Sequence, residues 1–262
     1  HQIAPDNPFY NVPLVLRLNG DIDTDDLRHT LSKLMQRHEV LRTSFPIVAD
    51  LPVQVIASDF APPFSVVDLR NLPAAERRAE AERIANLEAQ TPFALQTGPV
   101  FRAVLVTLSG TEHWLLLTFH HIVIDGWSMG ILTRELAELY RAAVAGTPAN
   151  LPDLPIQYAD FAAWQRDWLN GERLENQLRY WRTQLTDLTP LKLFTDRARS
   201  ATPTFAGALH SFSIPAAVVR ALRHLGEATN TTLYMVLLAG FQALLARYSG
   251  QEDIVVGSPI AN

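Results

Sequence analysis

The segment of residues 119–128, Phe-His-His-Ile-Val-Ile-Asp-Gly-Trp-Ser, is the densest cluster of chemically capable side chains in the chain. Histidine suits a general base, because an ordinary pKa of about 6.5 lets the imidazole take and return a proton around neutral pH. Adjacent side chains of a strand point to opposite faces, so we expect one of His120 and His121 to face a cleft and the other to pack inward. Asp125 would orient the loop electrostatically, and Gly126 would permit a tight turn or a close approach of backbone to ligand.

Each of these residues also has a structural explanation. A histidine pair at a strand end can serve packing alone, and Asp125 or Ser128 can cap the helix that follows, a role worth about 1 kcal/mol. A metal site is not expected, because the chain has no cysteine and its sequence places no His-x-x-x-His or His-Glu-x-x-His pair on a helix. General-base chemistry and helix capping therefore both stay open for this segment.

A second motif uses the same stretch of chain. Residues 126–130, Gly-Trp-Ser-Met-Gly, match the G-x-S-x-G nucleophile elbow, in which a serine is displayed on a sharp turn between strand and helix. A hydrolase would then use Ser128, but the elbow also needs an acidic residue and a later histidine, and only His210 and His224 follow. His224 lies in a predicted amphipathic helix, and no His-Gly-Gly-Gly oxyanion segment is present. We therefore rank serine chemistry below histidine chemistry.

The predicted elements place the histidine segment at the junction of a strand and a helix. Residues 100–108 and 113–119 are apolar runs separated by Ser-Gly-Thr-Glu, which predicts a hairpin of long strands whose second strand leads into the histidine pair. Residues 127–144 return to the helical period. Upstream, residues 12–18 are typical of a strand, and Thr24 is the expected N-cap of the helix that follows it.

The remaining elements extend an alternating α/β pattern along the chain. The patterns predict short strands at 42–45 and 53–56, helices at 73–90, 158–169, 172–185 and 232–248, a strand at 208–214 with a helix starting at Pro215, and a final strand and turn at 253–261. The Pro-rich residues 150–155 form a connector. We place a boundary near residue 170, between an N-terminal part at 1–170 and a C-terminal part at 171–262.

The composition is that of an ordinary globular protein, with 262 residues of which 48% are hydrophobic and 19% are charged. A formal net charge of -5 argues against nucleic-acid binding, which needs a clustered excess of Lys and Arg. No run approaches the roughly 18 consecutive apolar residues of a membrane span. The absence of cysteine excludes disulfides and thiolate nucleophiles and permits a reducing compartment, and we expect a cytoplasmic location.

Four segments of the chain resemble motifs of one family. Residues 120–128 resemble the HHxxxDG active-site motif of the condensation domains of nonribosomal peptide synthetases. Residues 37–45, Arg-His-Glu-Val-Leu-Arg-Thr-Ser-Phe, resemble the second motif of that family, and residues 158–166, Tyr-Ala-Asp-Phe-Ala-Ala-Trp-Gln-Arg, resemble its fourth. Residues 91–103 resemble the family's usual lead into the long strands. Several matches in the right order are far more specific than HHxxxDG alone, which related acyltransferases share.

The resemblance implies an α/β fold similar to chloramphenicol acetyltransferase, in which two lobes form a V with a tunnel between them. It implies that 1–170 is a nearly complete N-terminal lobe and that 171–262 holds the interlobe helix and the start of a C-terminal lobe. Residues 257–262 resemble the start of the family's fifth motif, and the first motif would precede His1. We therefore expect a domain truncated at both ends that is weakly active or inactive by itself.

The reaction that the resemblance implies is attack by the amine of an acceptor aminoacyl thioester on the carbonyl of a donor thioester. The chain itself would need no cofactor, because phosphopantetheine arms of donor and acceptor peptidyl carrier proteins bring the substrates, and an adenylation domain would be adjacent. The motif places His120, His121, Asp125 and Gly126 in the active site, with His121 as the base or the positioner of the amine. Asp125 would be structural and paired with an arginine, for which Arg42 is the candidate, and Gly126 would keep the tunnel open.

Flanking residues receive supporting roles from the same resemblance. Trp127 and Ser128 would contact substrate, while Arg42, Asp160 and Trp164 would be structural, with Trp164 packed at the lobe junction. The segments at 126–130 and 158–166 favour a condensation domain that joins an L-configured donor. The alternatives are epimerisation or another HHxxxDG acyltransferase, a serine hydrolase that uses Ser128, and a non-catalytic module that only docks carrier proteins.

Overall fold

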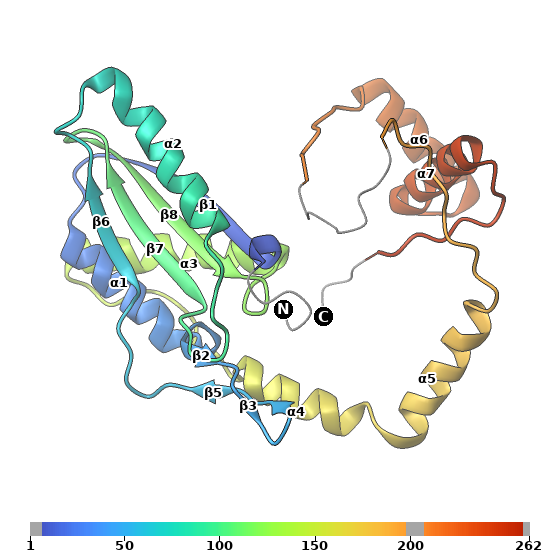
Figure 1. Cartoon of the computed structure of the whole chain (residues 1–262), viewed down its shortest axis with the longest axis horizontal. Helices are drawn as coiled ribbons and strands as arrows, with labels where there is room; N and C mark the ends of the chain where they lie inside the picture. Colours follow the sequence, from blue (N-terminus) through green and yellow to red (C-terminus); the bar gives the residue numbers. More distant parts are fainter. Residues whose placement is uncertain (1–6, 198–206, 259–262) are drawn as a thin grey trace. The chain divides into compact units, whose positions relative to one another are not determined.

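The computed structural model describes residues 7–197 and 207–258 of the chain (Figure 1). The chain divides into two compact units, His1–Leu169 and Asn170–Asn262. This division falls one residue before the boundary expected from the sequence. The first unit contains all the predicted site residues, so its sheet and helices determine their geometry.

The first unit is built on a four-stranded mixed sheet in the order β1-β8-β7-β6. Its strands are β1 (Asn11–Asn19), β6 (Phe64–Asp68), β7 (Phe101–Thr107) and β8 (Glu112–His120). The predicted hairpin is confirmed, because β7 and β8 pair antiparallel from Phe101 opposite Phe119 to Thr107 opposite His113. β6 pairs parallel with β7, so the chain must cross over between them, and it does so through the helix α2 (Ala74–Gln90).

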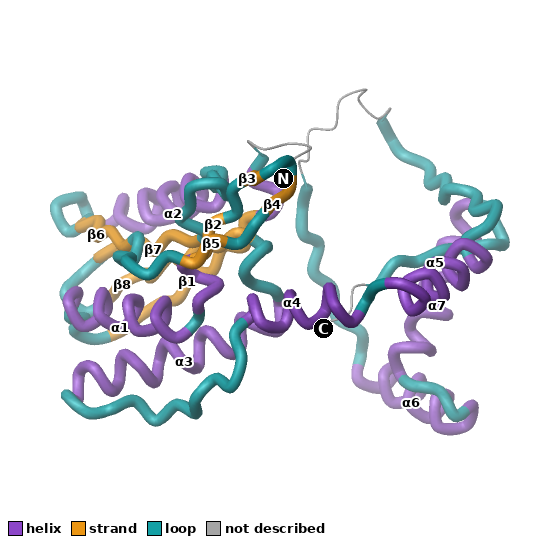
Figure 2. The backbone as a smooth tube through the Cα atoms, turned by 90° about the horizontal axis from the view of Figure 1, so that it is seen from below, coloured by secondary structure: helices purple, strands orange, loops and turns teal. Residues whose placement is uncertain are grey.

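Helices cover both faces of this sheet. The helices α1 (Thr24–Arg37) and α3 (Gly126–Ala145) pack side by side on one face, and α2 covers the other (Figures 1 and 2). A sheet covered on both faces needs strands that are apolar throughout, and β7 and β8 are buried over nearly their whole length. The fully buried side chains that pack between the sheet and the helices include Leu31, Leu34, Phe101, Leu105, Leu115, Leu117 and Phe119.

Short elements connect α1 to β6. They are the 3-10 turn η2 (Glu39–Arg42) and two small antiparallel pairs, β2 (Thr43–Ser44) with β5 (Val55–Ile56) and β3 (Ile47–Val48) with β4 (Leu51–Pro52). A 3-10 turn η1 (Pro8–Tyr10) precedes β1. The strands predicted at 42–45 and 53–56 are thus present in shortened form.

The N-cap of α1 differs from the prediction. Asp23, not Thr24, is the cap, and its Oδ1 accepts hydrogen bonds from the backbone N–H groups of Asp25 at 2.8 Å and Asp26 at 3.0 Å. Aspartate caps a helix as well as threonine does, and two consecutive candidates cannot be separated by pattern alone. The shift moves the helix start by one residue and leaves its buried face unchanged.

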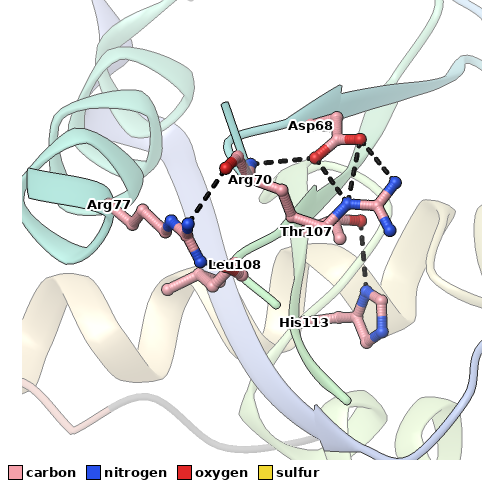
Figure 3. A network of polar contacts seen from close by, with 6 residues as sticks. All are labelled: Asp68, Arg70, Arg77, Thr107, Leu108 and His113. Carbon is pink, nitrogen blue, oxygen red and sulfur yellow. Dashed lines mark hydrogen bonds and ion pairs between the residues drawn. The ribbon is translucent and has the colours of Figure 1, made fainter. Parts of the chain in front are cut away.

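Polar contacts gather at the end of β7 and β8 opposite to the histidine pair, and Figure 3 shows them from close by. The guanidinium of Arg70 binds both carboxylate oxygens of Asp68 at the end of β6, and Arg77 of α2 donates to the carbonyl of Arg70 at 2.9 Å. Thr107 Oγ1 and His113 Nδ1 lie 3.1 Å apart between β7 and β8. Among these contacts, the one between Thr107 and His113 joins two strands of the sheet.

The second unit is helical in the part of the chain that the structure describes. It contains α5 (Gly171–Gln184), α6 (Ala216–Thr229) and α7 (Leu233–Ser249), as the sequence predicts, with Pro215 as the N-cap of α6 and not its first residue. The strands predicted at 208–214 and 253–261 are wrong for residues 208–214 and 253–258, which form no strand, and residues 259–261 lie outside the described residues. An alternating pattern makes a strand only when a neighbouring strand supplies hydrogen bonds, and no described segment pairs with these residues.

No single helix among the described residues is long and apolar enough to cross a bilayer, although α6 and α7, a pair bent by 106°, together have the required length and apolar composition.

Candidate active site

The first histidine of the pair is part of the core. His120 ends β8 and is 6% exposed, its backbone N–H donates to the carbonyl of Val100 at 2.9 Å, and its Nδ1 accepts from the N–H of Ile122 at 3.0 Å. The rings of Tyr10 and Phe93 lie 5.9 and 6.2 Å away, centroid to centroid. Burial lowers the pKa of His120 to about 4, with a smaller contribution from the positive charge of the neighbouring histidine. His120 is therefore a neutral, structural imidazole at neutral pH.

The second histidine faces the opposite way, as the strand geometry predicts. His121 is exposed, while its backbone N–H is held by the carbonyl of Tyr10 at 2.8 Å. A hydrogen bond from the N–H of Val123 to the carbonyl of His120, 3.1 Å long, closes the turn that follows the strand. The backbone on both sides of His121 is thus fixed, and its side chain is available for chemistry.

The His121 side chain lines a cavity of about 310 Å³ within the first unit. The walls come from the end of α1 and η2, the loop after β8, the start of α3 and the helix α4 (Tyr158–Trp168). Most lining side chains are apolar, and the full set is His38, Val40, Leu41, His121, Ile122, Val123, Ile124, Asp125, Ser128, Ile131, Leu132 and Tyr158. Such a mixture of apolar walls and a few polar groups is typical of a small-molecule site.

Asp125 caps the helix that carries the rest of the motif. Its Oδ1 accepts from the backbone N–H of Ser128 at 2.8 Å and from the Ser128 hydroxyl at 2.5 Å. These two hydrogen bonds, together with the positive charge of His121, lower the pKa of the Asp125 carboxyl below its usual range. The capping explanation therefore holds for Asp125, which orients the start of α3 beside the cavity as an anion.

The same hydrogen bond argues against a serine nucleophile. The Ser128 hydroxyl donates to the carboxylate of Asp125, and none of its hydrogen bonds within the described residues is to a histidine. A nucleophilic serine needs its proton on a base such as imidazole. Ser128 is therefore a helix-capping partner that lines the cavity wall.

Gly126 is the first residue of α3, and its φ lies outside the left-handed region. A methyl group added there would meet nothing within 4 Å. The turn itself therefore does not require glycine at this position, and the space beside Gly126 is open.

The proposed ion pair between Asp125 and Arg42 is wrong. The Arg42 guanidinium instead binds the carboxylate of Glu39 at 3.2 Å and the carbonyl of Ala57, and it lies over the ring of Phe60 with its Cζ 5.3 Å from the ring centroid. A guanidinium forms hydrogen bonds with the carboxylates nearest to it, and Glu39 is only one turn away in η2. Arg42 remains a structural residue, but it braces η2 and β5 and not the HHxxxDG loop.

Asp160 and the residue before α4 connect this helix to the rest of the site. The Asp160 carboxylate accepts a hydrogen bond from the backbone N–H of Gln157 at 2.8 Å. The side-chain Nε2 of Gln157 donates to the carbonyl of Arg37 at 2.9 Å, and its Oε1 accepts from the backbone N–H of Glu39 at 3.2 Å. Trp164 is 55% exposed and stacks on Trp168 with the ring centroids 5.7 Å apart. Asp160 thus caps the start of α4, and Trp164 stacks on a ring of its own helix.

Trp127 lies apart from the cavity. Its side chain is 76% exposed, and it is not among the residues that line the cavity. Among the described residues there is also no group of three or more His, Asp or Glu side chains arranged to hold a metal ion.

Sequence reasoning missed a second histidine at this cavity. His38 lines the cavity and its Nε2 lies 2.6 Å from the Oε2 of Glu135, which is buried on α3. Two sequence signals were available: His38 falls in the segment at 37–45 that resembles a family motif, and Glu135 interrupts the apolar face that carries Leu132 and Leu136. A charged residue on a buried helical face needs a partner, but periodicity does not reveal which one.

The fold and the histidine at the cavity wall define the condensation class of α/β domains, and comparison with solved structures agrees. The chain superposes on the X-domain from teicoplanin biosynthesis with a TM-score of 0.80 and 30% identity, covering 91% of this chain and 53% of that one. It also superposes on the first condensation domain of the calcium-dependent antibiotic synthetase, which was solved in complex with a substrate analogue. That match has a TM-score of 0.74 and 26% identity, and it covers 97% of this chain and 59% of that one.

The chain belongs to the condensation-domain family, whose family model, described as Condensation domain, matches residues 1–262. It is 47% identical over 261 residues to a linear gramicidin synthase of Brevibacillus parabrevis, covering 99% of this chain and 5% of that protein. It is 45% identical over 262 residues to phosphinothricin tripeptide synthetase PhsC of Streptomyces viridochromogenes, covering 100% of this chain and 24% of that protein. The expected chloramphenicol acetyltransferase-like fold is therefore confirmed, and the family's chemistry is acyl transfer that forms peptide bonds.

Proposed function

We propose that this chain carries the catalytic histidine of a domain that forms an amide between a carrier-bound donor thioester and a carrier-bound acceptor amine. The observation that carries the proposal is His121, whose side chain lines a cavity while its backbone is fixed and its neighbour His120 is neutral and buried. Membership of the condensation-domain family supports the reaction class. Because the chain spans 5% and 24% of the two relatives named above, the activity of the whole protein is part of the proposal.

The reaction needs little covalent help from the protein. The acceptor nitrogen attacks the thioester carbonyl, a C–N bond forms, the C–S bond breaks, and the amine proton passes to the departing thiolate. A thioester is already activated, so orientation could supply effective molarities of roughly 10⁵–10⁸ M in favourable cases. His121 would accept a hydrogen bond or proton from the attacking amine, and Asp125 would hold the loop that presents it.

Partners and a subtype are also part of the proposal. We propose that donor and acceptor peptidyl carrier proteins deliver the substrates on phosphopantetheine arms and that an adenylation domain lies adjacent. We further propose an L-configured donor, because residues 126–130 and 158–166 resemble that subtype. The free space beside Gly126 would admit the reacting end of such an arm.

The identity of the product tests this function. The chain spans 53% and 59% of the two solved chains compared above. The assay therefore uses a domain as long as those solved chains that contains the 262 residues, and we call it the full-length domain. Donor and acceptor amino acids are loaded on their carrier proteins, and products are identified by mass spectrometry. We expect a dipeptidyl thioester on the acceptor carrier, also with Ser128→Ala. Release of the donor as a free acid that Ser128→Ala abolishes would contradict the proposal and support hydrolysis.

One comparison favours a second candidate, a docking module without turnover. A solved structure that resembles this chain at 30% identity, with a TM-score of 0.77 and 92% of this chain covered, is a complex of the X-domain and OxyB from teicoplanin biosynthesis. A condensation-type fold can therefore serve to bind another protein. Carrier-protein binding without any amide product, unchanged by His121→Ala, would favour this candidate.

A further inference from the structure

A buried carboxylate lies behind the cavity wall. Glu135 of α3 is 6% exposed, and its Oε2 accepts from Arg37 Nε at 3.1 Å and contacts His38 Nε2 at 2.6 Å. An isolated buried carboxylate is costly, so these two partners from the end of α1 stabilise its charge. They also outweigh the opposing effect of burial and lower the pKa of Glu135, which is therefore an anion at neutral pH.

This contact fixes which nitrogen of His38 carries the proton. A carboxylate only accepts hydrogen bonds, so a neutral His38 ring donates from Nε2 and keeps its lone pair on Nδ1. No hydrogen bond to Nδ1 is present among residues 7–197 and 207–258, and the His38 side chain is 24% exposed and lines the same cavity as His121. A histidine oriented by a carboxylate through one nitrogen, with the other nitrogen open, is the arrangement of a general base.

We propose that His38 is a second proton acceptor of this cavity, oriented by Glu135, and that it deprotonates the ammonium group of the acceptor amino acid before His121 positions the neutral amine. The proton moves from the ammonium nitrogen to His38 Nδ1, which leaves a lone pair on the amine for attack on the thioester carbonyl. The imidazolium that forms is stabilised by the Glu135 carboxylate, and its proton is then lost to water, while the departing thiolate takes the second proton, which the attacking nitrogen releases as the amide forms. This inference rests on the proposed function, since it names how the nucleophile of that reaction is generated.

Few other charges compete around His38. The titratable or charged groups near His38 come from every element packed around it. They are Arg37 at the end of α1, Glu39 of η2, His121 and Asp125 of the loop after β8, Glu135 of α3 and Tyr158 of α4. The Arg37 charge is directed at Glu135 and at the carbonyl of Pro152, 2.6 Å away, while Asp125 is bound to Ser128. The carboxylate in direct contact with the His38 ring is that of Glu135.

A purely structural role must be distinguished, because the same cluster ties α1 to α3 and to the connector after it. His38→Gln makes this distinction, since the glutamine amide can still donate to Glu135 but cannot take up a proton at neutral pH. His29→Gln is the matched control, because His29 lies on α1, the helix that ends just before His38, with an exposed side chain. Both variants are expected to unfold at the wild-type temperature to within a few degrees.

The first test is the pH dependence of amide formation by the full-length domain. A reaction that depends on a base slows in acid, where the base is protonated, and this gives the pH profile an acid limb. We expect His38→Gln to lower kcat about 10²-fold or more near neutral pH and to remove this acid limb, while His29→Gln changes neither. An unchanged rate in His38→Gln, or a loss of equal size at every pH, would overturn the proposal and leave His38 structural.

The second test needs no turnover and so separates this proposal from the proposed function. Nitrogen-15 NMR of the histidine side chains of the 262-residue chain, in mildly alkaline solution, reports the tautomer of His38. We expect the proton on Nε2, and Glu135→Leu should release this preference. A proton on Nδ1 would overturn the proposal, whether or not the domain makes amides. If His121→Ala loses activity while His38→Gln forms amides at the wild-type rate, the proposed function stands and only this inference is rejected.

Discussion

The buried imidazole of His120 makes the stability of the first unit depend on pH. Its pKa is lowered to about 4 in the folded protein, whereas an unfolded histidine titrates at about 6.5. The unfolded chain therefore takes up a proton that the folded chain resists. The stabilising contribution of neutral His120 is fully present above about pH 6.5 and is lost as the pH falls toward 4.

The size of this loss follows from the depression of the pKa. At about 1.4 kcal/mol per pKa unit, the shift corresponds to roughly 3 kcal/mol once both states are protonated. Between about pH 7.5 and 4.5 the wild type should lose about 2.5 kcal/mol of unfolding free energy through this residue alone. Asp68 and Glu138, whose pKa values are lowered to about 2, titrate mainly below this window.

His120→Asn isolates the effect, because the asparagine oxygen can accept the N–H of Ile122 that His120 Nδ1 accepts now. The variant does not titrate, so we expect a lower stability at neutral pH from the lost ring but a pH dependence about 2.5 kcal/mol smaller than that of the wild type. Urea unfolding followed through the amide NMR signals of β8 reports on the first unit, and His29→Asn serves as the exposed control. Parallel stability curves for wild type and His120→Asn would refute the reasoning.

Four further substitutions, of which Gly130→Ala is a control, test other features of the structure. Asp125→Ala should cost about 1 kcal/mol of unfolding free energy through loss of the α3 cap, measured in urea at neutral pH, and an unchanged midpoint would contradict the capping role. Gly126→Ala and Gly130→Ala should both fold normally, since neither added methyl group meets an atom within 4 Å. Only Gly126→Ala should slow amide formation, and equal rates of amide formation in the two variants would exclude a ligand beside Gly126. Gly226→Ala should lower the stability of α6 by about 1–3 kcal/mol, because the added Cβ would lie 2.8 Å from the Thr231 carbonyl oxygen. Amide hydrogen exchange of α6 measures this loss, and unaltered exchange rates would show that the turn after α6 relaxes to admit the methyl group.

The elements that the sequence predicted correctly are those whose signal is local. The apolar runs of β7 and β8 and the helical period of α3 recur within a few residues, so they place the histidine pair at a strand end without knowledge of the rest of the fold. The divergence of His120 and His121 follows from strand geometry alone. This part of the site needed only the pattern of the segment itself.

The parts that were missed depend on contacts between distant residues. His38 and Glu135 are 97 positions apart and meet only because α1 and α3 pack on the same face of the sheet. The family resemblance made Arg42 the candidate partner of Asp125, whereas the nearer Glu39 binds it in the structure. The strand expected at 208–214 lacked a partner strand among the described residues, and alternation within one segment cannot supply one.

The most direct test of the account is the single-turnover rate of amide formation by the full-length domain with His121→Ala, at saturating carrier-bound donor and acceptor. If His121 acts on the amine at the cavity wall, the rate should fall by about 10²–10⁴-fold while the affinity for both carrier proteins and the unfolding temperature stay at wild-type values. Amide formation at the wild-type rate by His121→Ala would contradict the central claim.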